Sequence, residues 1–149
     1  MGTTRPGALS RAAALRALAL DPDARREPAA RRRLSAPALR TFFAITRAWG
    51  LSVADERALL GWPPPSTFHK YKAGQGGVLS FDTLTRISLV LGIYKALQVL
   101  YPDVGFADRW MQMPNANGLF GGRTPAAFVA DTGIDGLFQV RRLLDARRG

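Results

Sequence analysis

The fold is decided by residues 51–74, which have the sequence LSVADERALLGWPPPSTFHKYKAG. Ser52 is placed to cap a first helix, because a serine hydroxyl can accept a hydrogen bond from the backbone of the opening turn. Gly61 supplies the small residue that two steeply crossing helices need where they meet, and a second helix is predicted from Ser66 to Ala73. This layout is typical of a helix-turn-helix motif.

The second helix of this pair has one face to bury and one to expose. Phe68 and Tyr71 lie three residues apart, share a face and are expected to pack inward. The other face carries hydroxyls and donors that can reach phosphates and base edges. An αα-hairpin inside a helical bundle would give the same pattern, and the motif alone leaves both interpretations open. The candidate DNA-binding residues are Ser66, Thr67, His69, Lys70 and Lys72.

The remaining sequence predicts further helices and no strands, because no segment sustains a period-two alternation of apolar and polar residues. We therefore expect an all-α fold whose tryptophans lie in the core. Gly92 is expected to separate two helices, and Thr124 to cap a helix that has Pro125 at its first position. The expected helices cover residues 9–20, 38–49, 52–60, 66–73, 80–91, 93–101, 104–113, 125–130 and 134–147.

Positive charge is concentrated at the start of the chain. The 149 residues include 21 Lys and Arg against 11 Asp and Glu, and the formal net charge is +10. Residues 1–40 hold nine arginines and three acids, a net +6. We expect residues 1–35 to form a basic, partly helical arm, in which residues 25–33 are either a weak helix or a mobile segment. This charge favours nucleic acid, an acidic protein surface or anionic lipid as a partner, and a solvated tail is the alternative.

Composition excludes several kinds of chemistry. The absence of cysteine excludes disulfides, thiol nucleophiles and thiolate zinc sites, and the single histidine, His69, excludes a multi-histidine metal site. We expect no metal and no cofactor. No apolar run is judged to approach the roughly 18 residues needed to cross a bilayer, so a soluble protein with no membrane partner is expected. No carboxylate pair has a recognisable catalytic spacing, and the glycine-rich stretches lack a phosphate-loop pattern, so an enzyme is not expected.

Two further stretches carry a resemblance to a known family. They are DTLTRISLVLGIYKAL at residues 82–97 and the segment 110–125, which opens with WMQMPN and closes with FGGRTP. With them, the chain over about residues 38–147 resembles the Xre/MbcA/ParS antitoxins. The resemblance implies an Xre-like helix-turn-helix module at residues 36–103, followed by a small helical toxin-binding domain at residues 104–149.

The resemblance also implies a function. It indicates the antitoxin of a type II toxin–antitoxin system, which neutralises a RES-domain toxin by blocking its active site. Toxins of that group act on NAD, either degrading it or transferring its ADP-ribose to a target. A homodimer within a larger toxin–antitoxin assembly, repression of its own operon through operator DNA and a cytoplasmic location would follow. The alternative is a stand-alone Xre-like transcriptional regulator. The turn at residues 62–66 is one residue longer than is usual in the family, which bears on how the next helix seats in a major groove.

The expected toxin-binding residues lie in the loop before the helix that starts at Pro125 and in the last helix. Glycines allow backbone shapes and close approaches that other residues forbid, and asparagines suit an irregular loop. Arginine forks suit the phosphate-binding chemistry of an NAD pocket or its acidic lining. An ordinary connection between helices and dipole-matched arginines are the alternative. The candidate toxin-binding residues are Asn115, Asn117, Phe120, Gly121, Gly122, Arg123, Thr124, Pro125, Arg141, Arg142, Arg147 and Arg148.

Overall fold

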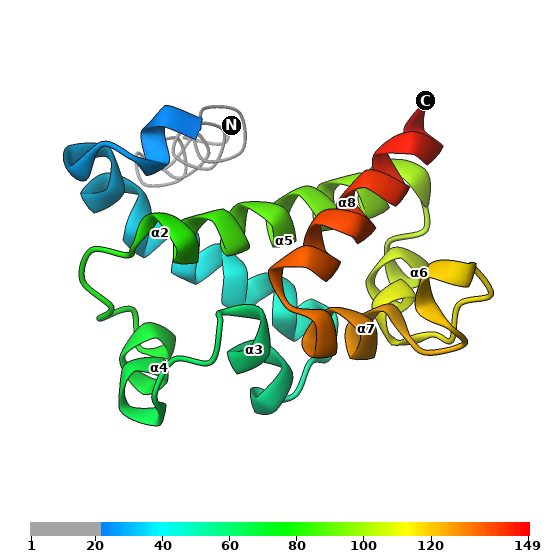
Figure 1. Cartoon of the computed structure of the whole chain (residues 1–149), viewed down its shortest axis with the longest axis horizontal. Helices are drawn as coiled ribbons and strands as arrows, with labels where there is room; N and C mark the ends of the chain where they lie inside the picture. The colour runs from blue at the N-terminus through cyan, green and yellow to red at the C-terminus, as the bar shows by residue number, and fades with distance from the viewer. Residues whose placement is uncertain (1–21) are drawn as a thin grey trace, which may run out of the picture.

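The computed structural model describes residues 22–149, and the short helix expected over residues 9–20 lies outside them (Figure 1). The described residues form α-helices and short 3₁₀ segments with no strand, so the predicted all-α fold is confirmed. The elements in chain order are η1 (Pro22–Arg25), α2 (Pro28–Ala48), α3 (Val53–Leu59), α4 (Pro65–Lys72), α5 (Phe81–Leu100), α6 (Val104–Arg109), η2 (Trp110–Gln112), η3 (Gly118–Phe120), α7 (Pro125–Thr132) and α8 (Ile134–Arg148).

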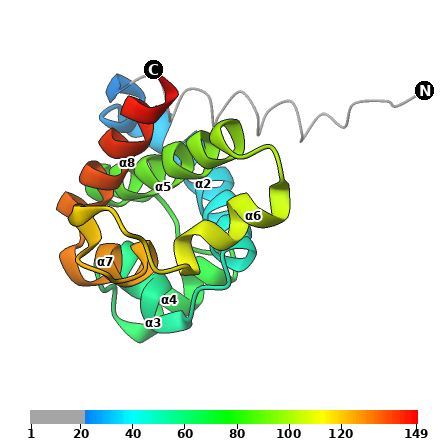
Figure 2. The same ribbon diagram turned by 90° about the vertical axis from the view of Figure 1, so that its right-hand side faces the viewer.

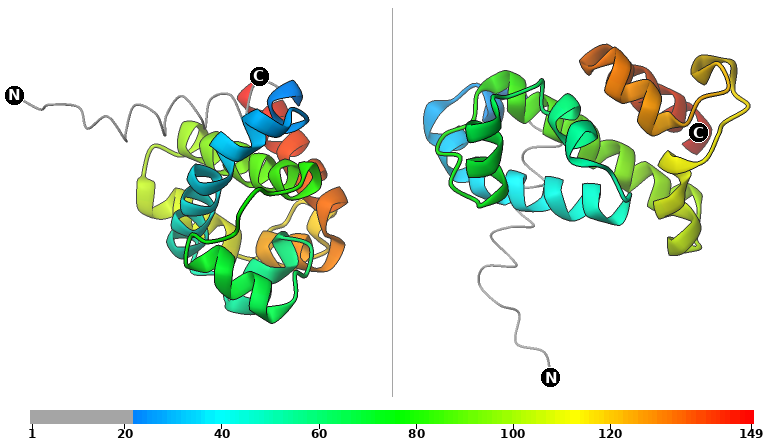
Figure 3. Two further views of the ribbon diagram at one scale, coloured as in Figure 1. Left: turned by 90° about the vertical axis from the view of Figure 1, so that its left-hand side faces the viewer. Right: turned by 90° about the horizontal axis from the view of Figure 1, so that it is seen from below.

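Helix α5 lies at the centre of the arrangement. Helix α2 packs along one side of it and α8 along the other, while α4 packs on α2 and α3 packs on α7 (Figure 3). Figure 2 shows α3, α4 and α7 together at the end of the molecule opposite α5. The side chains of α5 that are completely buried between its neighbours are Leu84, Ile87, Val90, Ile93, Ala96 and Leu97.

Helix α5 is more apolar than the sequence analysis allowed. By length and composition its 20 residues could cross a membrane, which corrects the expectation that no apolar run is long enough. Within the fold, 56% of its most apolar window is buried, against α2 and α8. An apolar helix enclosed in this way is the core helix of a domain, because its side chains are removed from water by protein neighbours.

Gly92 lies inside α5 and does not interrupt it, so the two helices expected over residues 80–91 and 93–101 are one. A Cβ atom at this position would collide with the guanidinium of Arg141, which crosses from α8. Glycine in a helix interior costs about 1 kcal/mol relative to alanine. The Arg141 side chain occupies the space beside Gly92, and the glycine lies inside the helix and is not a helix end.

Helix α2 begins ten residues before its expected start at residue 38, with Pro28 in its first turn. Pro37 suggested a boundary, but it lies inside the helix, where it lacks the N–H donor and crowds the carbonyl of Arg33. Leu34 is buried, and the buried Ser35 hydroxyl donates to the Arg31 carbonyl at 2.6 Å and accepts from the Leu79 amide at 2.9 Å. These contacts hold the first turns of α2 against the fold.

The segment ahead of α2 is attached to α5. Arg25 Nη1 donates to Ser88 Oγ at 2.9 Å, and the Arg25 guanidinium lies 5.6 Å from the centroid of the Phe81 ring. Residues 28–33 lie in α2 and Arg25 contacts α5, so the structure has the helical form of the two alternatives for residues 25–33. The expected limit of the arm at residue 35 falls within α2.

Three expected helix caps are present. The hydroxyls of Ser52, Ser80 and Thr124 each accept a hydrogen bond, at 3.1 Å in every case, from the amide three residues later. The helix expected over residues 104–113 is divided into α6 and η2, and the last two helices meet at Gly133, whose φ is +70°. Local capping chemistry therefore predicted these three helix starts, and the glycines at 50, 61 and 74 follow helix ends as expected.

We predict that Gly92→Leu lowers the free energy of unfolding by about 1–3 kcal/mol, because the added side chain takes the space that the Arg141 guanidinium fills and must displace it. Urea denaturation followed by circular dichroism measures the change. Removing the guanidinium in the double variant Gly92→Leu/Arg141→Ala should restore at least half of the loss, since the two groups compete for the same space. Strictly additive losses would show that Arg141 does not set the packing at Gly92.

Candidate functional site

Helices α3 and α4 form the helix-turn-helix pair that the sequence predicts, and both lie on the side of the molecule away from α5 (Figures 1 and 2). The chain leaves α3 through Gly61, whose φ of +84° is the left-handed conformation that glycine adopts without strain. A Cβ at Gly61 would lie 3.0 Å from Arg86 Nε, so the turn is also packed closely. Pro65 then opens α4 at its first position.

Helix α4 buries the face that was expected to pack inward. Phe68 is 2% exposed and meets Phe43 of α2 edge to face, with 5.7 Å between ring centroids. Tyr71 is half-buried against the same core. On the outer face, Ser66, His69 and Lys70 are exposed and Thr67 is half-buried. Three of the five candidate DNA-binding residues are thus fully open to solvent on this face, and Thr67 is partly so.

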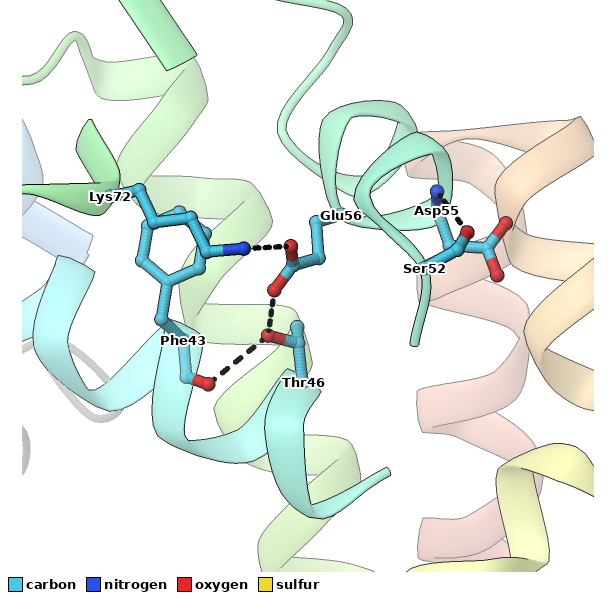
Figure 4. Close-up of polar contacts among 6 residues, drawn as sticks. All are labelled: Phe43, Thr46, Ser52, Asp55, Glu56 and Lys72. Carbon is cyan, nitrogen blue, oxygen red and sulfur yellow. Dashed lines mark hydrogen bonds and ion pairs between the residues drawn. The ribbon is translucent and has the colours of Figure 1, made fainter. Parts of the chain in front are cut away.

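Lys72, the fifth candidate, is held by the fold (Figure 4). Its Nζ lies 3.0 Å from Glu56 Oε1, and it sits 5.6 Å from the ring centroids of Phe43 and Phe68. The Glu56 side chain is only 6% exposed, and the Thr46 hydroxyl donates to its other carboxylate oxygen at 2.6 Å. Lys72 pairs with a buried carboxylate and so joins α4 to α3 and α2, while 44% of its side chain stays exposed.

Sequence analysis did not identify Glu56 as a buried residue. Its position early in α3 suggested only a favourable interaction with the helix dipole. The available signal was its place on the same helical face as Leu59 and Leu60, since a carboxylate three and four residues before buried leucines is directed toward the core. A buried carboxylate requires partners, and Thr46 and Lys72 supply them.

The turn between α3 and α4 exposes Trp62. Its φ of +61° is rare for a bulky residue, and it is 57% exposed, unlike the buried Trp49 and Trp110. The Arg57 guanidinium stacks 5.3 Å from its ring and donates to the Pro63 carbonyl at 2.9 and 3.2 Å. The expectation that all tryptophans lie in the core is therefore wrong for Trp62, which belongs to the longer turn.

Hydrogen bonds from backbone amides to two asparagine side chains fix the loop before α7. Asn115 accepts a hydrogen bond from the Asn117 amide, and Asn117 accepts one from the Leu119 amide, both at 2.9 Å. Gly121 and Gly122 follow with φ values of +58° and +84°. This geometry matches the expected use of asparagine and glycine, and it leaves residues 121–123 exposed on a defined loop.

Two of the candidate toxin-binding residues are structural. Phe120 is completely buried and meets Trp110 and Phe128 edge to face, with ring centroids 5.9 and 5.4 Å apart. Pro125 is buried at the first position of α7. Neither side chain is available to a partner, and together they anchor the loop to the core.

The candidate arginines lie in two separate places. Arg123 is on the loop, where it pairs with Asp131 at 3.2 Å. Arg141 and Arg148 both pair with Asp145 on α8, at 2.9 and 3.8 Å. Arg142 and Arg147 are exposed and have no ion pair within residues 22–149. The end of α8 extends away from the loop, so the candidate residues do not form one compact site (Figures 1 and 2).

The described part of the chain gives no sign of a metal centre. No group of three or more His, Cys, Asp or Glu residues among residues 22–149 could hold a metal ion. The hollow between α2, α3 and α4 has a volume of about 200 Å³. Its lining includes one acidic, two basic and three apolar side chains. Its lining residues are Phe43, Arg47, Leu51, Val53, Glu56 and Lys72.

A helix-turn-helix pair joined to a second helical domain defines a class of protein that combines a nucleic-acid-binding motif with a partner-binding domain. Comparison with known families identifies both parts. Residues 26–92 match the antitoxin Xre-like helix-turn-helix domain, and residues 96–149 match the antitoxin Xre/MbcA/ParS C-terminal toxin-binding domain. The chain belongs to the Xre/MbcA/ParS-type antitoxins.

One curated relative aligns with most of this chain. The uncharacterized protein y4oB of Sinorhizobium fredii (strain NBRC 101917 / NGR234) is 40% identical over 111 residues, which cover 74% of this chain and 84% of the relative. No solved structure matches this chain. The two family matches meet within α5, so a single helix serves both domains.

We predict that Lys72→Met lowers the free energy of unfolding by about 1–3 kcal/mol, because it leaves the buried Glu56 carboxylate without its cation. Lys70→Met, a matched change on the exposed side of the same helix, should alter stability by no more than about 0.5 kcal/mol. Thermal or urea denaturation distinguishes the two. Equal effects of both variants would contradict a structural role for Lys72.

Proposed function

We propose that this antitoxin neutralises a RES-domain toxin that acts on NAD, and that it does so by covering the toxin's active site. The observation that carries the proposal is the match of residues 96–149 to a toxin-binding domain. Within these residues, a fixed loop exposes Gly121, Gly122 and Arg123, and a helix end exposes Arg142 and Arg147.

The chemistry of these groups suits such a toxin. A pocket that binds NAD must accommodate a pyrophosphate and a cationic nicotinamide, so it presents anion-binding and acidic groups. Arginine guanidinium groups can pair with acidic groups at the rim of such a pocket through two parallel hydrogen bonds. A loop already fixed by Asn115 and Asn117 loses little conformational entropy when it docks, which favours tight binding.

We also propose that the antitoxin works in the cytoplasm as a homodimer within a larger complex, and that it acts by binding and not as an enzyme. The support for self-association is a group of exposed apolar side chains around the junction of α5 and α6. Val99 and Val104 are 58% and 59% exposed, and Phe106 is 37% exposed beside Tyr101. Exposed apolar side chains that lie together mark an interaction surface more often than isolated ones do.

The toxin proposal is tested with point variants. Deleting residues 115–149 would remove α8 from α5 and expose the core, so a truncation cannot separate binding from folding. We predict that Arg142→Glu/Arg147→Glu raises the antitoxin concentration needed for half-inhibition of NAD turnover by at least about tenfold, as expected for losing about 1.4 kcal/mol or more of binding free energy.

The control for this test is Arg32→Glu/Lys70→Glu, which makes the same change in charge at two exposed positions outside the toxin-binding domain and should inhibit as the unmodified protein does. The probe is the RES-domain protein that the proposal expects to be encoded beside this chain, and the lack of such a neighbour would count against the proposal. A stable complex that still turns over NAD would contradict blockade of the active site. Full toxin activity during co-expression would contradict neutralisation altogether, and it would favour the stand-alone transcriptional regulator.

A second proposed activity is binding of operator DNA through α4, which would let the antitoxin repress its own operon. The supporting observation is the exposure of Ser66, His69 and Lys70 on one face of a helix-turn-helix pair. Side chains at the start of the second helix are those that reach base edges in this motif. His69 and Lys70 can donate hydrogen bonds there, and Ser66 can donate or accept.

We predict that Lys70→Ala weakens binding to every DNA sequence and reduces the slope of log affinity against log salt by about 0.9, the effect of losing one phosphate contact. His69→Ala should instead reduce the preference for operator over random sequence. Fluorescence anisotropy at several salt concentrations measures both quantities. An unchanged slope for Lys70→Ala would show that this side chain does not contact phosphate.

A further inference from the structure

Helix α2 carries positive charge and no negative charge. Its 21 residues contain five arginines and neither aspartate nor glutamate. Arg33, Arg40 and Arg47 are spaced seven residues apart, and all three are exposed. We call these three residues the α2 stripe.

The spacing places the α2 stripe along one face of the helix. Seven residues are close to two full turns, and successive members differ in direction by only about 20°. At a rise of about 1.5 Å per residue, neighbouring members are about 10 Å apart and the whole stripe is about 20 Å long. The positions beside it are small or short, namely Ala36, Pro37, Thr41, Ala44 and Ala48.

The α2 stripe differs from the arginines of α8 in its lack of counter-charges. On α8, Arg141 and Arg148 share Asp145, so that charge is partly balanced within the helix. No member of the α2 stripe has an ion pair or a hydrogen-bonded side chain among residues 22–149. Surface helices usually alternate the two signs at neighbouring turns, because opposite charges stabilise the helix and like charges do not.

We propose that the α2 stripe is a second DNA-contact surface, which binds the sugar–phosphate backbone of duplex DNA without regard to sequence. This inference rests on the proposed binding of DNA by the helix-turn-helix pair and extends it to a separate helix. A row of guanidinium groups about 20 Å long matches a backbone, which presents regularly repeated phosphates over that distance. Arginine is well suited to phosphate because its fork donates two parallel hydrogen bonds.

The fold keeps the α2 stripe beside α4. Phe43 of α2 packs on Phe68 of α4, and Lys72 of α4 lies over the Phe43 ring. Arg47 lines the hollow that Lys72 and Val53 also border, so one end of the stripe reaches the helix-turn-helix pair. DNA read by α4 can therefore continue along α2, and the stripe would strengthen binding to flanking DNA where base edges are not read.

The experiment removes the charges one at a time. Arg40→Gln, Arg40→Gln/Arg47→Gln and Arg33→Gln/Arg40→Gln/Arg47→Gln are compared with the unmodified chain on a random-sequence duplex of about 30 base pairs, between about 50 and 200 mM salt. Each substitution should lower the slope of log affinity against log salt by about 0.9, and the triple variant should bind at least about tenfold more weakly at the lowest salt.

The matched control is Lys95→Gln/Arg109→Gln, which removes two exposed positive charges from α5 and α6. If it lowers the slope as much as Arg40→Gln/Arg47→Gln does, the effect is one of net charge and the proposal is overturned. An unchanged slope in the triple variant also overturns it. If the triple variant binds DNA normally but no longer forms the complex with the toxin, the stripe faces an acidic protein surface and the DNA assignment is wrong.

The same measurements distinguish a failure of the α2 stripe proposal from a failure of the proposed operator binding by α4. Loss of the stripe should weaken binding to operator and random DNA by the same factor, whereas His69→Ala should change only the ratio between them. If the stripe variants weaken binding while variants of α4 have no effect, the stripe is supported and the proposed recognition by α4 fails. Helical content and melting temperature by circular dichroism should stay unchanged in every variant, because all the substituted side chains are exposed.

Discussion

The close packing of α8 across α5 at Gly92 is the contact on which the rest of the structure depends. Helix α5 is too apolar to face water, and α2 covers only one of its sides. Helix α8 covers the other, and the Arg141 side chain of α8 lies over Gly92 where the two helices pack. The contact also joins the two domains, because α5 contributes to both family matches. The helix-turn-helix pair and the toxin-binding domain therefore share one core.

The sequence predicted features that depend on neighbouring residues and missed those that depend on distant ones. Caps such as Ser52 and Thr124 follow from interactions within one turn, so they were predicted correctly. Gly92 and Pro37 were taken as helix boundaries because both disfavour helix locally. Tertiary packing outweighed that preference at both positions, since α5 and α2 are held by buried neighbours on more than one side.

In the candidate site, too, features set by neighbouring residues were predicted and features set by distant residues were missed. The inward packing of Phe68 and Tyr71 followed from helical spacing alone. Lys72 was assigned to the DNA-binding face because nothing local identifies Glu56, sixteen residues away, as its buried partner. Phe120 was assigned to the toxin interface because its motif is distinctive, yet its side chain completes the core. Residue identity alone does not distinguish a side chain that supports a surface from one that forms it.

The sharing of α5 has a consequence for how such antitoxins diversify. The limit between the two family matches falls in the middle of a buried helix, where no exposed linker exists. A recombination event at that point would join the first part of α5 from one ancestor to the end of α5 and the α8 of another. That α8 would have evolved to pack on a different α5. Only exchanges that keep α5 and α8 together would preserve the contact at Gly92. The helix-turn-helix and toxin-binding domains are therefore expected to be inherited as a unit, and new specificities should arise by substitution on the exposed faces.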